Sequence, residues 1–350
     1  MIRVAIVGAT GYTGAELLRL LLSHPEVEVT HLAAHGRAGM RLSEALPSLS
    51  GLLDLPLEPF DAARVAEAAD VAFCGLPHGA SAPAVSALLE AGLKVLDLSA
   101  DFRLRDPAVY EAWYGAHPHT ELCARSVYGL PELHREAIAA ARLIAVPGCY
   151  PTSAILCLAP LLANRLIEPK SIVIDSKSGV SGAGRTPSPT THLPETAEGI
   201  RAYKVAGTHR HTPEIEQELS SVAGEPITVT FTPHLAPMTR GILTTAYATP
   251  RAEALGGLAD GACQDLARSF FSGSPSVRVL DPGRLPDTLF VRGSNFAHLA
   301  YAVDRRASRI LAFAAIDNLV KGAAGQAVQC LNLMFGLPEG TGLGGAPMFP

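Results

Sequence analysis

The sequence has few charged residues and no excess of basic ones. Only 17% of its 350 residues are charged, and 33 acidic against 28 basic side chains give a formal net charge of −5. Binding to nucleic acid or to a membrane surface usually needs a basic face, so this balance argues against both. Because charge is low while 48% of the residues are hydrophobic, disorder is also excluded. The length indicates about two domains.

Several short motifs are missing as well. The six cysteines form no Cys-x-x-Cys pair, so neither a zinc ribbon nor a thioredoxin motif is visible. No apolar run reaches the roughly 18 residues of a membrane-spanning helix. We see no signal peptide, and therefore expect reduced thiols and a cytoplasmic location. No Tyr-x-x-x-Lys pair occurs, which argues against a short-chain dehydrogenase.

The first part of the chain alternates between strand and helix patterns. Short apolar runs predict strands, and amphipathic runs predict helices. The expected strands are 2–7, 27–33, 71–74, 95–98 and 143–146, and the expected helices are 15–22, 80–91 and 131–141. Such alternation implies parallel pairing, so we predict an α/β fold with a Rossmann doubly wound parallel sheet.

After about residue 165 the pattern changes, and strands follow one another with fewer helices between them. The expected strands are 171–176, 226–232, 241–248, 277–280, 298–303 and 309–316. This predicts a second, α+β domain with a mixed or antiparallel sheet. Residues 177–200 are rich in Ser, Gly, Thr and Pro and predict a long functional loop. An apolar stripe predicts a helix over 318–334.

A glycine-rich turn joins the first strand to the first helix. Gly8 allows a tight turn, Gly11 allows pyrophosphate to approach, and Gly14 allows close helix packing. The helix start offers free N–H groups and a positive dipole end to phosphates. We therefore predict a dinucleotide site that also includes Thr10, Tyr12 and Thr13. The alternative is a glycine-rich turn without a ligand.

The end of the second strand indicates which dinucleotide binds. An NAD-binding unit usually places Asp or Glu here, but the sequence reads Ala-His35-Gly-Arg37. Arg37 instead favours the 2′-phosphate of NADP, with His35 beside it. The alternative is that Arg37 is an ordinary surface residue.

Cys149 follows a strand and opens an apolar helix, with Pro151 expected at its first helical position. A helix N-terminus lowers a thiol pKa, and Gly148 lets a substrate approach closely. From the residues alone, Cys149 is either a nucleophile or a structural thiol. Cysteines in apolar patterns are expected in the core: Cys74, Cys157, Cys263 and Cys330.

Two histidines, His209 and His211, precede a helix expected over 214–219, with Thr212 as its N-cap. The positive end of a helix disfavours imidazolium, so a neutral histidine that acts as a base is expected. Surface or core histidines are the alternative. Arg210 between them either binds an anion or is solvated. No acidic residue is spaced with the pair as metal ligands would be, so no metal is predicted.

Together these residues resemble the N-acetyl-γ-glutamyl-phosphate reductase family, within the aspartate-semialdehyde dehydrogenase superfamily. The match runs over essentially the whole chain and keeps the motifs in order. One departure is His35-Gly36, where Ser or Ala is expected beside Arg37. The matching segments are Gly8–Gly14, Gly75–Gly79, Leu98–Arg103, Pro147–Thr152, Ser178–Arg185, His209–Ile215 and Ala315–Gly322.

The resemblance implies NADPH-dependent reduction of an acyl phosphate in arginine biosynthesis. Cys149 would form a thioester, phosphate would leave, and one histidine would handle the proton, with His209 favoured over His211. Further cofactor residues would be Leu76, Pro77, Ser178, Gly179, Ser181, Gly182 and Asn318. Substrate-binding residues would be Arg103, Ser99, Tyr150, Arg185 and Arg210.

The resemblance also implies an organisation. Residues 1–147 would form the NADP-binding Rossmann domain, with a C-terminal helix at 317–335 packing back on it. Residues 148–316 would form the catalytic and oligomerisation domain of a homodimer or homotetramer. The closest rival is a lysine-biosynthesis reductase that acts on a carrier-linked aminoadipyl phosphate. Aspartate-semialdehyde dehydrogenase itself and a nonenzymatic NADPH sensor are weaker alternatives, and the sensor would need neither Cys149 nor the histidines.

Overall fold

The computed structural model describes residues 1–255, 259 and 261–350. The chain divides into two compact units. Unit 1 comprises Met1–Gly148 and Ala323–Gly344, and unit 2 comprises Cys149–Gly322 and Gly345–Pro350. Across the described residues, no helix combines the length and the apolar character needed to cross a membrane.

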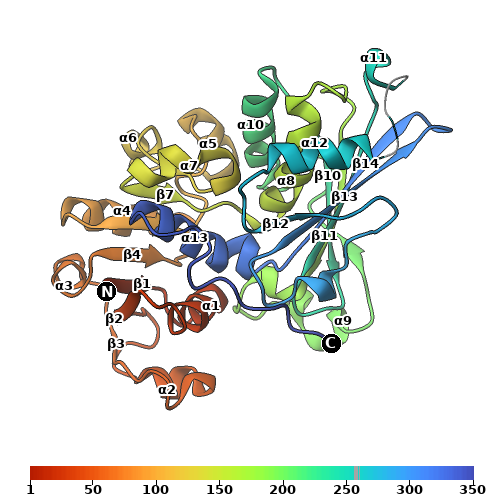
Figure 1. The fold of residues 1–350 in the computed structure, drawn as a ribbon. Coiled ribbons are helices and arrows are strands. Elements are labelled where there is room, and N and C mark those ends of the chain that lie inside the picture. The colour runs from red at the N-terminus through yellow and green to blue at the C-terminus, as the bar shows by residue number, and fades with distance from the viewer. Residues whose placement is uncertain (256–258, 260) are drawn as a thin grey trace. The chain divides into compact units, whose positions relative to one another are not determined.

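Unit 1 contains the predicted parallel sheet, which has seven strands within the described residues, in the order β3-β2-β1-β4-β5-β7-β6 (Figure 1). Every adjacent pair is parallel. The strands are β1 (Ile2–Val7), β2 (Val27–Ala33), β3 (Leu57–Glu58), β4 (Val71–Cys74), β5 (Lys94–Asp97), β6 (Val127–Tyr128) and β7 (Leu143–Ala145). Both faces of β4 are buried, which explains its uninterrupted apolar run.

Helices connect and cover these strands, as the alternating pattern predicts. α3 packs beside α4, and the buried side chains of Val65 and Val85 join the core around β4. α13 lies beside α1 and α7. The helices of unit 1 are α1 (Tyr12–Leu21), α2 (Leu42–Ala45), η1 (Pro47–Leu49), α3 (Ala62–Ala68), α4 (Ser81–Glu90), α5 (Pro107–Tyr114), α6 (Thr120–Cys123), α7 (Pro131–Ala140) and α13 (Gly325–Met334).

The last long helix of the chain differs from its prediction at its start. The first turn, η5 (Val320–Ala324), is a π-helix, and the N–H of Gly322 bonds to the carbonyl of Asp317 at 2.9 Å. The regular helix α13 follows, and its buried Gln326 amide donates to the carbonyl of Gly129 at 3.0 Å.

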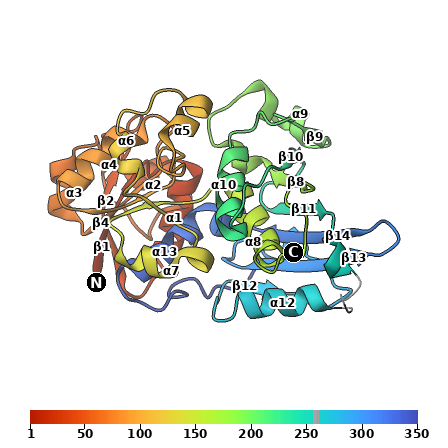
Figure 2. The ribbon, with the colours of Figure 1, turned by 90° about the horizontal axis from the view of Figure 1, so that it is seen from above.

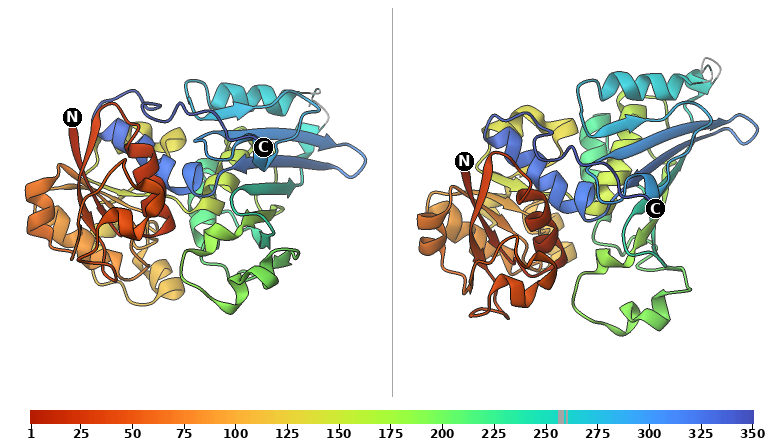
Figure 3. Two further views of the ribbon diagram at one scale, coloured as in Figure 1. Left: turned by 90° about the horizontal axis from the view of Figure 1, so that it is seen from below. Right: turned by 60° about the horizontal axis from the view of Figure 1, so that its bottom comes forward.

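Unit 2 contains the predicted mixed sheet, with the described strands in the order β12-β13-β14-β11-β8-β10-β9. The β8–β10 and β12–β13 pairs are parallel, and the other pairs are antiparallel. β13 and β14 form the long hairpin drawn in blue in Figures 2 and 3. The strands are β8 (Val173–Gly179), β9 (Arg201–Ala202), β10 (Thr230–Ala236), β11 (Ile242–Ala248), β12 (Val277–Val279), β13 (Ala297–Asp304) and β14 (Arg309–Ile316).

Helix α8 (Cys149–Ala163) packs against β11, β13 and β14 and is buried over nearly its whole length. A hydrogen-bonded chain of hydroxyls, Ser153 to Thr244 to Ser176, links it to the sheet at 2.7 and 2.8 Å. The other helices are η2 (Val180–Ala183), η3 (Pro189–Thr191), α9 (Leu193–Thr196), α10 (Thr212–Ala223), α11 (Ala252–Leu255), α12 (Ala262–Phe270) and η4 (Thr288–Phe290).

Two local predictions in unit 2 are wrong. The strand expected at 226–232 lies at Thr230–Ala236, because it pairs in parallel with β8 rather than beginning where the apolar run begins. The loop expected over 177–200 is partly ordered, since β8 extends to Gly179 and three short helices follow.

Candidate active site

Cys149 is the first residue of α8, at the helix start where the sequence predicts it, so that Pro151 is the third residue of the helix rather than the first. The Cys149 side chain is partly exposed, whereas the other five cysteines are buried. Burial raises the pKa of Cys157 to about 12 and that of Cys123 and Cys263 to about 11. Those thiols therefore stay protonated near neutral pH, and Cys149 is the more accessible thiol.

An aromatic cluster surrounds Tyr150, the next residue in α8. The buried Tyr150 hydroxyl donates to the carbonyl of His234 at 3.0 Å and accepts from the Tyr203 hydroxyl at 3.2 Å. The rings of His209 and His211 pack edge-on against Tyr150, with centroids at 5.6 and 6.0 Å. The structure thus brings both predicted histidines to the residue that follows Cys149.

The hydrogen bonding of His209 defines its protonation. Its buried Nδ1 accepts the backbone N–H of His211 at 3.1 Å. Burial, reinforced by the charge of Lys204, lowers the pKa of His209 to about 4. A neutral ring whose Nδ1 accepts a hydrogen bond carries its proton on Nε2. At neutral pH His209 is therefore a hydrogen-bond donor through Nε2.

His211 occupies the N-cap position of α10, and Thr212 is already helical. The prediction of Thr212 as N-cap is therefore wrong by one residue. No side-chain hydrogen bond caps this helix start. His211 lies at the N-terminal, positive end of the α10 dipole. Arg210 between the two histidines is exposed.

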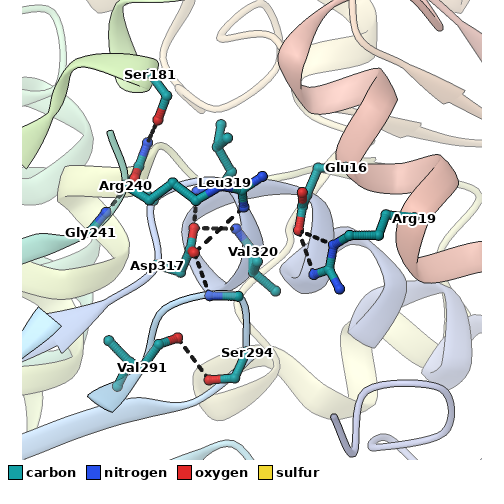
Figure 4. A network of polar contacts seen from close by, with 12 residues as sticks. Glu16, Arg19, Ser181, Arg240, Gly241, Val291, Ser294, Asp317, Leu319 and Val320 are labelled. Carbon is teal, nitrogen blue, oxygen red and sulfur yellow. Dashed lines mark hydrogen bonds and ion pairs between the residues drawn. The ribbon is translucent and has the colours of Figure 1, made fainter. Parts of the chain in front are cut away.

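The residues predicted near the nicotinamide also come together in unit 2. The Asn318 amide donates to the Ser181 hydroxyl at 2.9 Å and accepts the N–H of Gly241 at 2.8 Å (Figure 4). A Cβ on Gly179 would lie 2.7 Å from the backbone of Thr239 and Arg240. A Cβ on Gly182 would lie 3.2 Å from the Ser178 hydroxyl. Gly179 is therefore needed for this close packing, whereas a side chain at Gly182 would require the Ser178 hydroxyl to shift by a few tenths of an ångström.

The glycine turn of unit 1 has the geometry that the dinucleotide fingerprint predicts. Gly8 has a φ of +91°, and a Cβ there would lie 2.5 Å from the carbonyl oxygen of Gly75. A Cβ on Gly14 would lie 2.6 Å from the carbonyl oxygens of Ala9 and Gly8. Gly11 is different, since a Cβ there meets only the Gly8 oxygen at 3.7 Å. Gly11 is the N-cap residue of α1 and gives the helix no side-chain cap, so this helix start suits a phosphate.

The other predicted cofactor residues of unit 1 lie near the ends of its strands. Arg37 is half-buried, and its guanidinium donates to the carbonyl of Ala45 at 2.8 Å. His35 is exposed, and Leu76 and Pro77 directly follow Gly75 after β4. Thr10 and Thr13 are half-buried and Tyr12 is 41% exposed.

Two buried carboxylates in unit 1 were not predicted as site residues. Asp101 accepts the N–H groups of Gly79 at 2.8 Å and Ala82 at 3.0 Å, which fixes the loop after β4. Asp97 accepts the hydroxyls of Ser81 and Ser99, each at 2.6 Å. Burial raises the pKa of Asp97 to about 6. The sequence carried a signal for both acids: Asp97 ends the apolar strand β5, and Asp101 lies in the Leu98–Arg103 segment that follows it.

The predicted substrate residues divide between the units. In unit 1, Arg103 is buried and donates to the carbonyls of Val146 at 2.7 Å and Leu98 at 2.9 Å. Ser99 is held by Asp97. In unit 2, Tyr150 lies in the aromatic cluster and Arg185 is exposed. Within the described part of the chain, no group of three or more His, Cys, Asp or Glu side chains is arranged to hold a metal.

Comparison with known proteins gives the family. Residues 3–141 match the semialdehyde dehydrogenase NAD binding domain, and residues 149–318 match the semialdehyde dehydrogenase dimerisation domain. Curated N-acetyl-gamma-glutamyl-phosphate reductases from Pelobacter propionicus and Geobacter metallireducens are 52% and 53% identical to this chain. Both matches cover 100% of this chain and 100% of the relative. The chain belongs to the N-acetyl-gamma-glutamyl-phosphate reductase family.

Solved structures agree on the fold. Aspartate semialdehyde dehydrogenase II from Vibrio cholerae, complexed with ASA, has a TM-score of 0.72 at 19% identity, covering 96% of this chain and 98% of its own. The Candida albicans enzyme with NADP has a TM-score of 0.69 at 16% identity, covering 97% and 99%. The predicted fold, a parallel Rossmann sheet plus a mixed sheet, is confirmed for this member of the reductase family.

Proposed function

We propose that this chain reduces N-acetyl-L-glutamyl 5-phosphate with NADPH, giving N-acetyl-L-glutamate 5-semialdehyde and phosphate, a step of arginine biosynthesis. The observation that carries the proposal is the partly exposed Cys149 at the start of α8, beside the cluster of Tyr150, His209 and His211. Full-length identity to curated reductases of that name supports the free N-acetylglutamyl substrate over the carrier-linked aminoadipyl one.

The first step is acyl transfer to Cys149. The thiolate attacks the acyl carbon, the C–S bond forms, and the bond from carbon to the phosphate oxygen breaks. Phosphate leaves with the electron pair, and a thioester remains on Cys149. The N–H groups at the start of α8 favour both the thiolate and the oxyanion that forms during attack.

The second step turns the thioester into the aldehyde. NADPH, when bound, would supply the hydride that adds to the thioester carbon. The carbon–sulfur bond of the resulting tetrahedral species then breaks, which releases the aldehyde and returns Cys149 as the thiolate. His209 donates a hydrogen bond from Nε2 to the oxygen on which negative charge develops, because its Nδ1 already accepts the His211 N–H. His211 takes the proton-exchange role, since the Nδ1 lone pair of His209 is engaged. Because this tautomer of His209 has its Nδ1 lone pair engaged, we propose His211 rather than His209 as the acid/base.

Each unit, taken by itself, has residues that fit part of the cofactor. The uncapped start of α1 at Gly11, together with Thr10, Tyr12 and Thr13, holds the pyrophosphate. Arg37 and His35 hold the 2′-phosphate, and the Ala45 contact already orients the Arg37 guanidinium. The loop of Leu76 and Pro77, fixed by Asp101, lines the adenosine side. The segment around Asn318 lines the nicotinamide side: Ser178, Gly179, Ser181, Gly182 and Asn318.

Basic and polar side chains bind the substrate. Arg103 and Ser99 receive the phosphoryl group, and a guanidinium is suited to bidentate contact with it. Arg185, Arg210 and Tyr150 contact the acyl chain and its carboxylate.

The protein forms a homodimer or homotetramer in the cytoplasm. The mixed sheet has a second face, opposite the one that α8 covers. On this face Val173 and Lys177 of β8 pair with Tyr247 and Leu243 of β11. Val173 and Tyr247 are 40% and 38% exposed. We assign this face to a second copy, in keeping with the dimerisation domain that residues 149–318 match. Leu243→Arg should yield monomers in light scattering, and an unchanged oligomer would refute the assignment.

The reverse reaction tests the function. Wild-type protein with N-acetyl-L-glutamate 5-semialdehyde should reduce NADP⁺ only when phosphate is present, and Cys149→Ala should lose that activity. Protein that binds NADPH but is inactive with the free semialdehyde would point to the carrier-linked substrate. Activity retained by Cys149→Ala would exclude the covalent mechanism.

A further inference from the structure

The glycine at position 322 lies against the nucleophile. A Cβ built on Gly322 would lie 2.7 Å from the Cβ of Cys149 and 3.2 Å from its Cα. These atoms are the root of the Cys149 side chain and its backbone, so a rotamer change cannot relieve the contact. The chain passes between the two units directly before Cys149 and directly after Gly322.

The turn that carries Gly322 is held firmly. It is the π-helix η5, a geometry that is frequent at functional sites. The buried Asp317 carboxylate accepts the N–H groups of Leu319 at 2.8 Å, Val320 at 3.2 Å and Gly293 at 2.7 Å (Figure 4). It also pairs with the Arg240 guanidinium at 3.5 Å. The turn is thus anchored at its start by one carboxylate and placed with Gly322 facing Cys149.

We infer that Gly322 is a positioning residue for the nucleophile. The absence of a side chain lets the π-turn press against the Cα and Cβ of Cys149 and hold its thiol at the start of α8, where the helix dipole favours thiolate. Any side chain at 322 displaces Cys149 from that position. The inference rests on the proposed role of Cys149, but its deciding readout, the alkylation rate of the thiol, needs neither substrate nor cofactor.

Thiol alkylation measures the position of Cys149 directly. The rate of iodoacetamide modification of Cys149, located by peptide mass spectrometry, is followed over a pH series for wild type, Gly322→Ala and Gly344→Ala. The last is the matched control, since a Cβ on Gly344 meets no atom within 4 Å. Gly322→Ala should shift the midpoint of the pH–rate curve upward and lower kcat at least about tenfold. The NADPH affinity of Gly322→Ala should equal that of wild type, and Gly344→Ala should match wild type in its pH–rate curve and kcat. A Gly322→Ala curve that coincides with wild type would overturn the inference.

A stability cycle covers the case in which Gly322→Ala folds poorly. Cys149→Gly removes the Cβ that lies 2.7 Å from the new methyl group. If the contact is direct, Gly322→Ala lowers Tm much less in the Cys149→Gly background than in wild type. Equal losses in the two backgrounds, or an unfolded double variant, would refute direct contact. Failure of the proposed reaction would show separately, as activity retained by Cys149→Ala.

Discussion

Gly11→Ala separates cofactor binding from folding. The backbone at Gly11, with φ −74° and ψ 169°, is one that alanine adopts readily, and the new Cβ would meet only the Gly8 oxygen at 3.7 Å. Alanine is a poorer N-cap residue than glycine, which costs about 1 kcal/mol of stability. Alanine also reduces the conformational freedom of the unfolded chain, which stabilises the fold by about 0.4–1 kcal/mol. The two terms nearly cancel, so the variant should fold with a free energy of unfolding within about 1 kcal/mol of wild type.

Binding should change far more than folding does. The added methyl group occupies the approach of pyrophosphate to the start of α1, and a hydrogen bond to a charged group is worth about 1.5–3 kcal/mol. We therefore expect NADPH to bind about 10 to 100 times more weakly. Fluorescence titration with NADPH and thermal unfolding of the same samples measure both quantities. Gly14→Ala, whose Cβ would lie 2.6 Å from two carbonyl oxygens, should instead lose the fold of unit 1. A Gly11→Ala protein that binds NADPH as wild type does would refute the assignment.

Three further predictions concern charge. Arg37→Asp should weaken NADPH at least about tenfold more than NADH, since it removes a cation from the 2′-phosphate; equal losses in titrations would contradict this. The pKa of His209 is lowered from 6.5 to about 4. The unfolded chain therefore takes up the proton first, and wild type should lose about 3 kcal/mol of stability as pH falls from 6.5 to 4. His209→Gln should lose correspondingly less in denaturant unfolding, and parallel curves would argue against a neutral His209. The pKa of Asp97 is raised from 3.8 to about 6, so its effect on stability has the opposite sign. The protonated carboxyl contributes fully to the free energy of unfolding below pH 3.8, and this contribution is lost as pH rises through 6. Asp97→Asn should not show this loss of stability with rising pH. An identical pH dependence of stability in wild type and Asp97→Asn would count against the raised pKa.

Local sequence rules predicted the features that depend on neighbouring residues. Gly8 and Gly14 were identified because their spacing between strand and helix permits one backbone path, and the structure shows carbonyl oxygens where their side chains would be. Cys149 was placed at a helix start because a strand precedes it and an apolar helix follows. Parallel pairing in unit 1 followed from the alternation of elements.

Features set by distant residues were not predictable in this way. The Tyr203–Tyr150 hydrogen bond joins residues 53 positions apart, and no local pattern indicates it. The shift of β10 to Thr230–Ala236 depends on its pairing with β8. The π-turn was predicted as ordinary helix, because its apolar stripe also suits an α-helix, and only the contact of Gly322 with Cys149 reveals its role.

The most direct test of the central claim is to look for the thioester on Cys149. The protein is mixed with N-acetyl-L-glutamyl 5-phosphate without NADPH, and its intact mass is measured after acid quenching. Wild type should gain one N-acetylglutamyl group, mapped to the peptide of Cys149 and released as the semialdehyde on addition of NADPH, while Cys149→Ala should gain none. Turnover of this substrate with no acyl group on Cys149, or an equal gain in Cys149→Ala, would contradict the account.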